Sequence, residues 1–133
     1  MTRVNVVPIK KLCNKHLFAE WREMPRLVQN LHISLNRKSK PFDKSEISPV
    51  YTLGKGHVKF FYDKFKYLHK RHIKITDELV KRGYNLSTTD SSFFRNVPKE
   101  YYNDYKPTKE DKRVNWARIE VRMPKNPRYT LAK

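Results

Sequence analysis

The chain has 133 residues, of which 30 are Lys or Arg and 13 are Asp or Glu, so its formal net charge is +17. This length predicts one domain, residues 1–133, with a single modest core. A basic excess of this size predicts a polyanionic partner, because a merely well-solvated surface would carry both signs in balance. We therefore expect the chain to bind nucleic acid.

The remaining composition narrows the class of protein further. The single cysteine, Cys13, excludes an intramolecular disulfide and a cysteine-rich metal site. Lys10 and Lys11 interrupt the apolar start of the chain, so no signal peptide is expected, and no run reaches the roughly 18–20 apolar residues of a membrane span. The five histidines form no ligand pattern. We expect a cytoplasmic, monomeric protein that needs no metal or cofactor and stays outside the membrane.

The first predicted helix covers about residues 14–36, with Asn14 as its N-cap. Its apolar residues keep the three-or-four spacing of one buried stripe: Leu17, Trp21, Met24, Val28, Leu31 and Leu35. Pro25 interrupts this helix, at a cost on the order of 3 kcal/mol in a regular interior. The sequence leaves two interpretations open: a simple kink, or a bend that helps to aim Glu23.

A second helix is predicted over His57–Arg82, after a loop over residues 36–56 that prolines and glycines punctuate. Gly83 follows it as a natural stop. His72 falls on the apolar face of this helix, so we expect it in the core rather than in a metal site. The whole face consists of Phe61, Phe65, Leu68, His72, Ile75 and Leu79.

Residues 84–107 show no helical or strand period and predict a long connection, packed down by Tyr101, Tyr102 and Tyr105. Thr108 and Asp111 resemble a capping box, which opens a third, shorter helix that ends before Pro124. The tail, residues 125–133, is expected to be irregular. Because no strand pattern competes, the sequence predicts an all-α fold of three main helices with long loops.

Charged residues repeat at helical spacing on two of these helices. Arg22, Glu23 and Arg26 lie three or four residues apart and so share one side of the first helix. Arg118 and Arg122 repeat the spacing on the third. Taken alone, such pairs are better explained as solvated surface charges, and Glu23–Arg26 as a weak surface ion pair.

The start of the chain adds a candidate nucleophile. Methionine before a small residue is normally removed, which would leave the α-amine of Thr2 as the mature N-terminus. Such an amine has a pKa of about 7.7–8.0 in peptides, so a useful fraction is neutral and nucleophilic at working pH. Together with the basic charge, this predicts a protein that binds a polyanion and attacks a carbon electrophile with its own terminus.

Two blocks of the sequence resemble the phage pyrimidine-dimer DNA glycosylases, the endonuclease V family of the T-even phages. The first block joins Thr2-Arg3-Val4-Asn5 to the run from His16 to Arg26. The second consists of Ile47-Ser48-Pro49, Leu53-Gly54, Gly56 to Lys64, Lys70-Arg71 and Lys81 to Asn85. The resemblance is strong over residues 2–85 and loose over 86–123, where Ala117-Arg118 and Arg122 fall into register.

This resemblance implies a compact three-helix protein whose N-terminal segment threads between the helices and brings the Thr2 amine beside Glu23. It implies DNA repair on duplex DNA carrying UV damage: the bond between base and sugar is cut at the 5′ pyrimidine of a cyclobutane dimer, and the strand is then broken by β-elimination. Thr2 would attack C1′ and form an imine, assisted by Glu23.

The resemblance also implies a set of DNA-binding residues. Arg3, Arg22 and Arg26 would hold phosphates and lower the pKa of the amine. The other expected DNA contacts are His16, Arg118 and Arg122, the last being an arginine where the family has a lysine.

The C-terminal tail departs from the aromatic-rich tail of the family prototype, because Asn126–Lys133 contains one aromatic residue, Tyr129. This leaves open the same amine chemistry on other lesions, or on abasic sites only. A further alternative is a non-catalytic DNA-binding protein, whose binding would depend steeply on salt and form no covalent intermediate.

Overall fold

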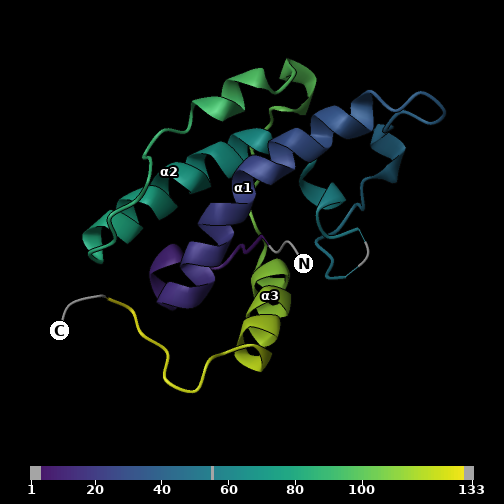
Figure 1. The fold of residues 1–133 in the computed structure, drawn as a ribbon. Helices are drawn as coiled ribbons and strands as arrows, with labels where there is room; N and C mark the ends of the chain where they lie inside the picture. Colours follow the sequence, from purple (N-terminus) through teal and green to yellow (C-terminus); the bar gives the residue numbers. More distant parts are fainter. Residues whose placement is uncertain (1–3, 55, 131–133) are drawn as a thin grey trace.

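The computed structural model describes residues 4–54 and 56–130, and these residues form helices and loops without a β-strand. Three α-helices carry the fold: α1 (Asn14–Leu35), α2 (Phe65–Lys81) and α3 (Lys109–Val121). Helices α1 and α2 pack against each other, while α3 lies across from α1 on the side where the described N-terminal segment enters (Figure 1). The all-α prediction is confirmed. Short 3₁₀ turns occupy the connections: η1 (Ile9–Lys11), η2 (Lys44–Glu46), η3 (Lys59–Phe61), η4 (Ser92–Asn96) and η5 (Lys99–Tyr101).

Helix α1 has the predicted extent, but its predicted N-cap is wrong. Cys13 takes the N-cap position and Asn14 is the first helical residue. The Asn14 side chain instead accepts a hydrogen bond from Nη1 of the buried Arg82 at 3.1 Å, so it is not available to cap its own helix. The predicted stripe faces the core, with four residues buried and two partly buried: Leu17, Met24, Val28 and Leu31, then Trp21 and Leu35.

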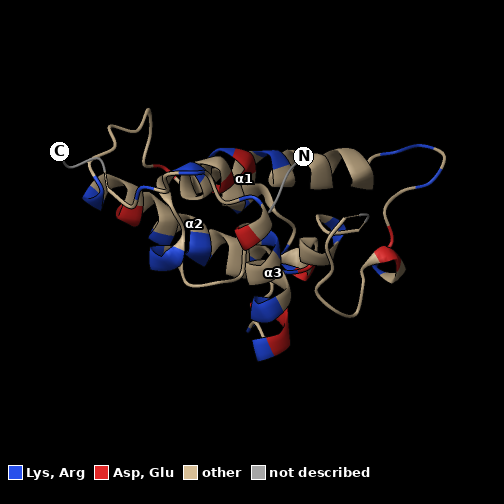
Figure 2. Ribbon diagram, turned by 90° about the horizontal axis from the view of Figure 1, so that it is seen from below, with Lys and Arg blue, Asp and Glu red and all other residues tan. Residues whose placement is uncertain are grey.

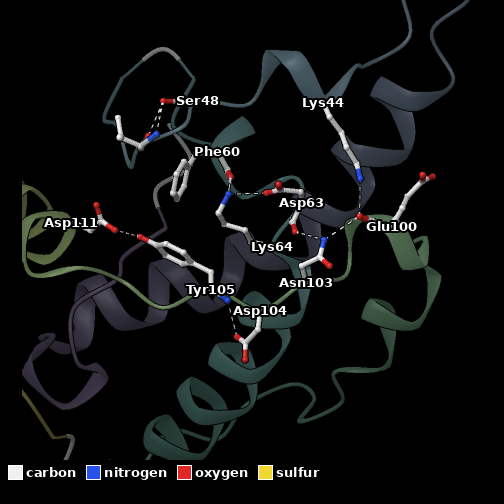
Figure 3. A network of polar contacts seen from close by, with 11 residues as sticks. Lys44, Ser48, Phe60, Asp63, Lys64, Glu100, Asn103, Asp104, Tyr105 and Asp111 are labelled. Atoms are coloured by element: carbon white, nitrogen blue, oxygen red, sulfur yellow. Dashed lines mark hydrogen bonds and ion pairs between the residues drawn. The ribbon is translucent and has the colours of Figure 1, made fainter.

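The second helix is shorter than predicted, because α2 begins at Phe65 and not at His57. Lys64 precedes it with φ −126° and ψ 34°, outside helical values, and η3 lies before this break. The Lys64 ammonium donates to the Phe60 carbonyl at 2.9 Å and to Asp63 Oδ1 at 2.7 Å (Figure 3). A side chain thus satisfies a backbone carbonyl where the helix is interrupted.

The other end of α2 agrees with the prediction. Gly83 has φ 106°, in the left-handed region that glycine adopts without strain. The N–H groups of Gly83 and Tyr84 donate to the carbonyls of Val80 and Leu79, both at 3.0 Å, which is the Schellman pattern of a helix stop. All members of the predicted stripe are buried: Phe61, Phe65, Leu68, His72, Ile75 and Leu79.

Helix α3 opens with the predicted capping box. The Asp111 N–H donates to Thr108 Oγ1 at 3.0 Å, and the Thr108 N–H donates to Asp111 Oδ2 at 3.1 Å. Unlike the other two helices, α3 buries little apolar surface: its fully buried residues are Asn115 and Ile119. A polar side chain therefore occupies the centre of its inward face.

The long connection, residues 84–107, runs back along α2 before it reaches α3 (Figure 1). Asn103 fastens it to the start of α2, because its Nδ2 donates to the Asp63 carbonyl at 3.0 Å and to the Glu100 carbonyl at 3.1 Å (Figure 3). The tyrosines predicted to pack this segment lie against the core: Tyr101 buried, Tyr102 and Tyr105 partly buried.

Residues 124–130 return from α3 to the start of α1 without regular structure, as predicted for this part of the tail. The Asn14 N–H donates to the Arg128 carbonyl at 2.6 Å. The ring of Tyr129 lies 5.8 Å from the Arg82 guanidinium, close enough for a cation–π contact.

Candidate functional site

Helix α1 presents its charged residues on the side that faces α3. Glu23 and Arg26 form an ion pair, with Nη1 3.5 Å from Oε2; the Glu23 side chain is 22% exposed and that of Arg26 is 68% exposed. Pro25 lies inside the continuous helix and has no N–H, so it donates no hydrogen bond to the carbonyl of Trp21. Glu23 therefore lies in the turn where the helical hydrogen-bond pattern is incomplete.

A hollow of about 470 Å³ separates α1 from α3, and we call it the α1–α3 hollow. Helix α1 lines it with Lys15, His16, Ala19, Glu20, Arg22 and Glu23. Helix α3 contributes Arg118 and Ile119, its C-cap residue Arg122 adds a third side chain, and the N-terminal segment contributes Asn5. The structure thus brings together predicted residues that are about 100 positions apart in the sequence.

His16 joins the two helices at the edge of this hollow. Its Nε2 lies 3.1 Å from the carbonyl oxygen of Arg122, and because a carbonyl can only accept, the ring nitrogen donates. Partial burial lowers the pKa of His16; the bond to the Arg122 carbonyl opposes this shift and the charge of Lys15 adds to it. His16 therefore favours its neutral form, as a link between α1 and the end of α3.

The hollow has a positive rim. Lys15, Arg22, Arg118 and Arg122 all line it, and basic residues alternate with acidic ones along the helices that meet there (Figure 2). The second carboxylate of the hollow, Glu20, forms an ion pair with the buried guanidinium of Arg71, which neutralises its charge. The arrangement suits a phosphate backbone at the rim and a single accessible carboxylate, Glu23, inside.

The segment from Val4 to Val7 is buried and leads into this region. The Val4 N–H donates to Nε2 of His57 at 2.9 Å, and the Tyr51 hydroxyl donates to the Val4 carbonyl at 3.3 Å. His57 Nδ1 lies 2.9 Å from the Thr52 carbonyl. Since Nε2 accepts, Nδ1 carries the proton of a neutral ring and donates to Thr52. The expected contact of the N-terminal segment with the helices is confirmed.

The predicted site residues divide into three groups. His16, Arg22, Glu23, Arg118 and Arg122 line the α1–α3 hollow. Arg26 lies one turn beyond and reaches it through its ion pair with Glu23. Thr2 and Arg3 lie outside the described residues.

Other residues at the hollow were not predicted as site residues. Glu20 and Asn5 line it and are buried, and Lys15 adds to its positive rim. A signal for Glu20 was present in the sequence: it lies three residues after Leu17 and four before Met24, which places a carboxylate on the buried stripe of α1. A buried carboxylate needs a partner of opposite charge, so this position indicated a buried ion pair.

Two larger hollows have other linings. One of about 690 Å³ lies beside Pro25 and Phe93, and one of about 670 Å³ lies between the N-terminal segment and α2. Neither is lined by Glu23 or by the arginines of α3. We take the smaller α1–α3 hollow as the candidate site, because His16, Arg22, Glu23, Arg118 and Arg122 line it.

The described residues contain neither a metal-binding cluster nor a membrane-spanning helix. Within residues 4–54 and 56–130, no group of three or more His, Cys, Asp or Glu residues is placed to hold a metal ion. No helix in these ranges is long and apolar enough to cross a membrane.

Comparison with known protein families gives a match over residues 1–92. The match includes α1, α2 and the N-terminal segment, and therefore the part of the hollow that holds Glu23. Helix α3 lies outside the matched range, and the fold brings Arg118 and Arg122 to the same hollow. The matching family acts on UV-damaged DNA and is described as pyrimidine dimer DNA glycosylase. With 92 of the 133 residues matched, the chain belongs to the pyrimidine dimer DNA glycosylase family and is a DNA repair glycosylase, and its α1–α3 hollow is lined by basic side chains and by Glu23.

Proposed function

We propose that this glycosylase acts on cyclobutane pyrimidine dimers in duplex DNA through the α-amine of Thr2, exposed by removal of Met1, and that it also breaks the strand at the resulting site. Glu23 is the proton-transfer residue in this proposal. Arg3, Arg22, Arg26, Arg118 and Arg122 hold the DNA, with His16 at their edge, and the protein acts as a monomer of one domain.

The position of Asn5 is the observation that carries the proposal. Asn5 lines the same hollow as Glu23, and Thr2 precedes it by three residues. Three extended residues span at most about 11 Å. The terminal amine is therefore tethered within that distance of a residue at the hollow, which supports its role as the nucleophile there.

The proposed reaction has three steps. The neutral amine adds to C1′ as the bond between C1′ and the pyrimidine nitrogen breaks, and the base leaves with the bonding electrons. The ring C1′–O4′ bond then opens, O4′ takes a proton and the amine loses one, which gives an imine. Finally a base removes a proton from C2′, a C2′–C3′ double bond forms, and the 3′ phosphate leaves. Glu23 is suited to the proton transfers because it is half-buried at the hollow and surrounded by cations.

The basic rim supports DNA as the substrate. Arg22, Arg118 and Arg122 approach the hollow from two helices, so a phosphate backbone bound across it would meet cations on both sides. A dimer weakens the pairing and stacking of its duplex, which lowers the cost of exposing the sugar to the amine.

A second candidate is the same amine chemistry on a wider range of lesions or on abasic sites only. The position of Tyr129 favours it. This ring contacts Arg82 at the end of α2 and is absent from the lining of the α1–α3 hollow. It is therefore not placed to stack on a base bound there, and recognition of the dimer would depend on other contacts.

Borohydride trapping tests the proposal directly. Duplexes that carry one cyclobutane dimer, one abasic site or no damage are incubated with the protein and reduced, so that any imine becomes a stable adduct. We expect an adduct at Thr2 with the dimer and abasic duplexes and none with undamaged DNA. Protein acetylated at its N-terminus is the matched control and is expected to give no adduct.

Each other result of this experiment has a defined meaning. An adduct with the abasic duplex alone would contradict dimer specificity and support the second candidate. An adduct at a lysine would discard Thr2 as the nucleophile. The absence of any adduct would contradict amine catalysis.

A further inference from the structure

A closed ring of buried hydrogen bonds connects the N-terminal segment to all three α-helices. Its side chains are Asn5, Glu20 of α1, Arg71 of α2 and Asn115 of α3, which are 5%, 1%, 7% and 0% exposed. Polar groups this deeply buried are costly unless every one has a partner. In this ring they find those partners mainly in one another and in the backbone of the N-terminal segment.

Asn115 binds the segment from the side of α3. Its Oδ1 accepts from the Val6 N–H at 2.7 Å and from the Val7 N–H at 3.3 Å. Its Nδ2 donates to Asn5 Oδ1 at 2.9 Å. One amide side chain therefore fixes two consecutive peptide groups and the side chain before them.

Glu20 and Arg71 close the ring from the other two helices. Asn5 Nδ2 donates to Glu20 Oε1 at 2.9 Å. Arg71 donates to both oxygens of Glu20, from Nε to Oε2 and from Nη2 to Oε1 at 3.2 Å, and its Nη1 donates to the Val7 carbonyl at 3.0 Å. The ring closes through Val7, because its N–H donates to Asn115, which in turn donates to Asn5.

The chemistry of the ring allows one orientation for each amide. A peptide N–H can only donate, so the atom of Asn115 that faces Val6 is its oxygen. The Glu20 carboxylate held by Arg71 can only accept, so the atom of Asn5 that faces it is its nitrogen. The remaining atoms of the two asparagines then meet as donor and acceptor. The segment is held in a single register, because a shift by one residue would break several of these bonds together.

We infer that this ring is a positioning device for the reacting end of the chain, with Asn115 as the positioning residue that fixes it. The inference rests on the proposed function, in which the amine of Thr2 is the nucleophile. The ring holds the chain at Asn5, three residues from that amine, and two of its members, Asn5 and Glu20, also line the hollow that holds Glu23. Asn115 itself touches neither substrate nor amine in this account and acts through the backbone of Val6 and Val7.

The test compares Asn115→Leu, which removes all three bonds and keeps the branched shape of the side chain, with Asn115→Asp, which keeps the two acceptor contacts. Asn103→Leu is the control variant, because the Asn103 amide also joins two segments of the chain, but the carbonyls to which it donates are those of Asp63 and Glu100 and not those of the N-terminal segment. Each variant is assayed well below its own melting temperature. The readouts are the single-turnover rate of imine formation on an abasic duplex, the Kd for a duplex with a tetrahydrofuran abasic analogue, and hydrogen exchange at Val6 and Val7.

We expect Asn115→Leu to lower the rate of imine formation about 100-fold, since displacement of a reacting group by about 1 Å has effects of this size. The Kd is expected to change by less than about threefold, because the phosphate-binding arginines remain. Protection of the Val6 and Val7 amides should be lost while that of Leu27 and Leu31 in α1 is kept. Asn115→Asp should give an intermediate rate, and Asn103→Leu should match the wild type.

Other outcomes would overturn the inference. An unchanged rate in Asn115→Leu, or in Asn115→Asp where the leucine variant does not fold, would show that the ring does not position the amine. Equal losses of rate, binding and protection throughout α1 would show that Asn115 only stabilises the fold. Failure of the wild type to form an imine would overturn the proposed function and this inference together, which distinguishes it from a failure confined to the variants.

Discussion

The guanidinium of Arg71 holds the carboxylate of Glu20 with two hydrogen bonds, whereas Glu23, three residues further along α1, meets Arg26 at 3.5 Å. Burial acts to lower the pKa of Arg71, but the charge of Glu20, the hydrogen bonds to Glu20 and the interaction with Tyr67 together raise that pKa. Both carboxylates line one hollow. Their surroundings differ: Glu20 is buried and paired with Arg71, whereas Glu23 is partly exposed and is the carboxylate that we propose for the chemistry.

Replacement of Glu23 by glutamine is expected to remove strand cleavage and leave DNA binding largely intact. A glutamine amide keeps the shape of the side chain but cannot accept and return a proton, and proton transfer of this kind contributes about 10²–10⁴-fold to rates. Single-turnover cleavage of a dimer duplex measures the loss, and anisotropy measures binding. Glu120→Gln is the matched control, because it makes the same charge change on an exposed residue of α3. Cleavage by Glu23→Gln at the rate of this control would refute the assignment.

Replacement of Glu20 by glutamine is expected to destabilise the protein by about 3–5 kcal/mol, because it leaves the buried Arg71 without a counter-charge. Urea unfolding at pH 7.5 measures the change. The double variant Glu20→Gln, Arg71→Met should recover part of the loss, since no unpaired charge remains. The exposed pair of Arg113 and Glu110 provides the control, and Glu110→Gln should leave the midpoint unchanged. Equal midpoints for Glu20→Gln and Glu110→Gln would contradict the structural role of Glu20.

Local patterns were sufficient for most of the helices. The apolar spacing gave α1 to within a residue at each end, and the capping box gave the start of α3. The start of α2 was wrong because the apolar pattern continues through residues 57–64, although Lys64 leaves helical geometry and binds the Phe60 carbonyl. Periodicity depends only on which side chains are apolar. A break in the helical backbone that a lysine side chain stabilises therefore leaves the apolar pattern unchanged.

The candidate site was accessible from the sequence in part. Spacing and resemblance singled out Glu23 and the arginines that the fold brings to one hollow, and their roles stay predictions. The ring around Asn115 was not accessible, because its bonds join residues separated by 15 to 110 positions. Asn115 lies four residues before the buried Ile119, so the sequence could place an amide on the inward face of α3 but could not name its partners.

Neutralisation of Arg122 is expected to weaken binding to damaged duplex and to reduce its dependence on salt. If Arg122 binds a phosphate, Arg122→Gln should lower the slope of log K against log salt concentration by about 0.9. Arg113→Gln is the control, because it removes the same charge from the same helix at a residue outside the hollow that pairs with Glu110. Anisotropy titrations between about 50 and 200 mM NaCl measure both slopes. Equal slopes for the two variants would remove Arg122 from the DNA-binding surface.

Stability is expected to fall in mild acid because His72 is buried in its neutral form. Burial lowers the pKa of His72 from 6.5 to about 4, with a smaller contribution from His69. His72 Nδ1 is hydrogen-bonded to Ser91 Oγ at 2.7 Å and its ring stacks on Trp21. Between pH 6.5 and 4, His72 binds a proton in the unfolded chain but not in the folded chain. Its contribution to the free energy of unfolding is therefore complete above pH 6.5 and is lost as the pH falls towards 4.

The shift corresponds to at most about 3 kcal/mol between these limits. Urea unfolding at a series of pH values from 7.5 to 4.5 measures the slope, and His72→Gln is the informative variant because glutamine does not titrate. Its free energy of unfolding should be lower at pH 7.5 and should decline less steeply with acid than that of the wild type. The residual slope includes His16 and His69, whose pKa values are also lowered by burial. Near pH 4.5 it also includes Glu46 and Glu110, whose pKa values are lowered by hydrogen bonds to Lys59 and Arg113. A variant that declined as steeply as the wild type would show that the acid sensitivity of the fold originates outside the contact between α1 and α2 that His72 occupies.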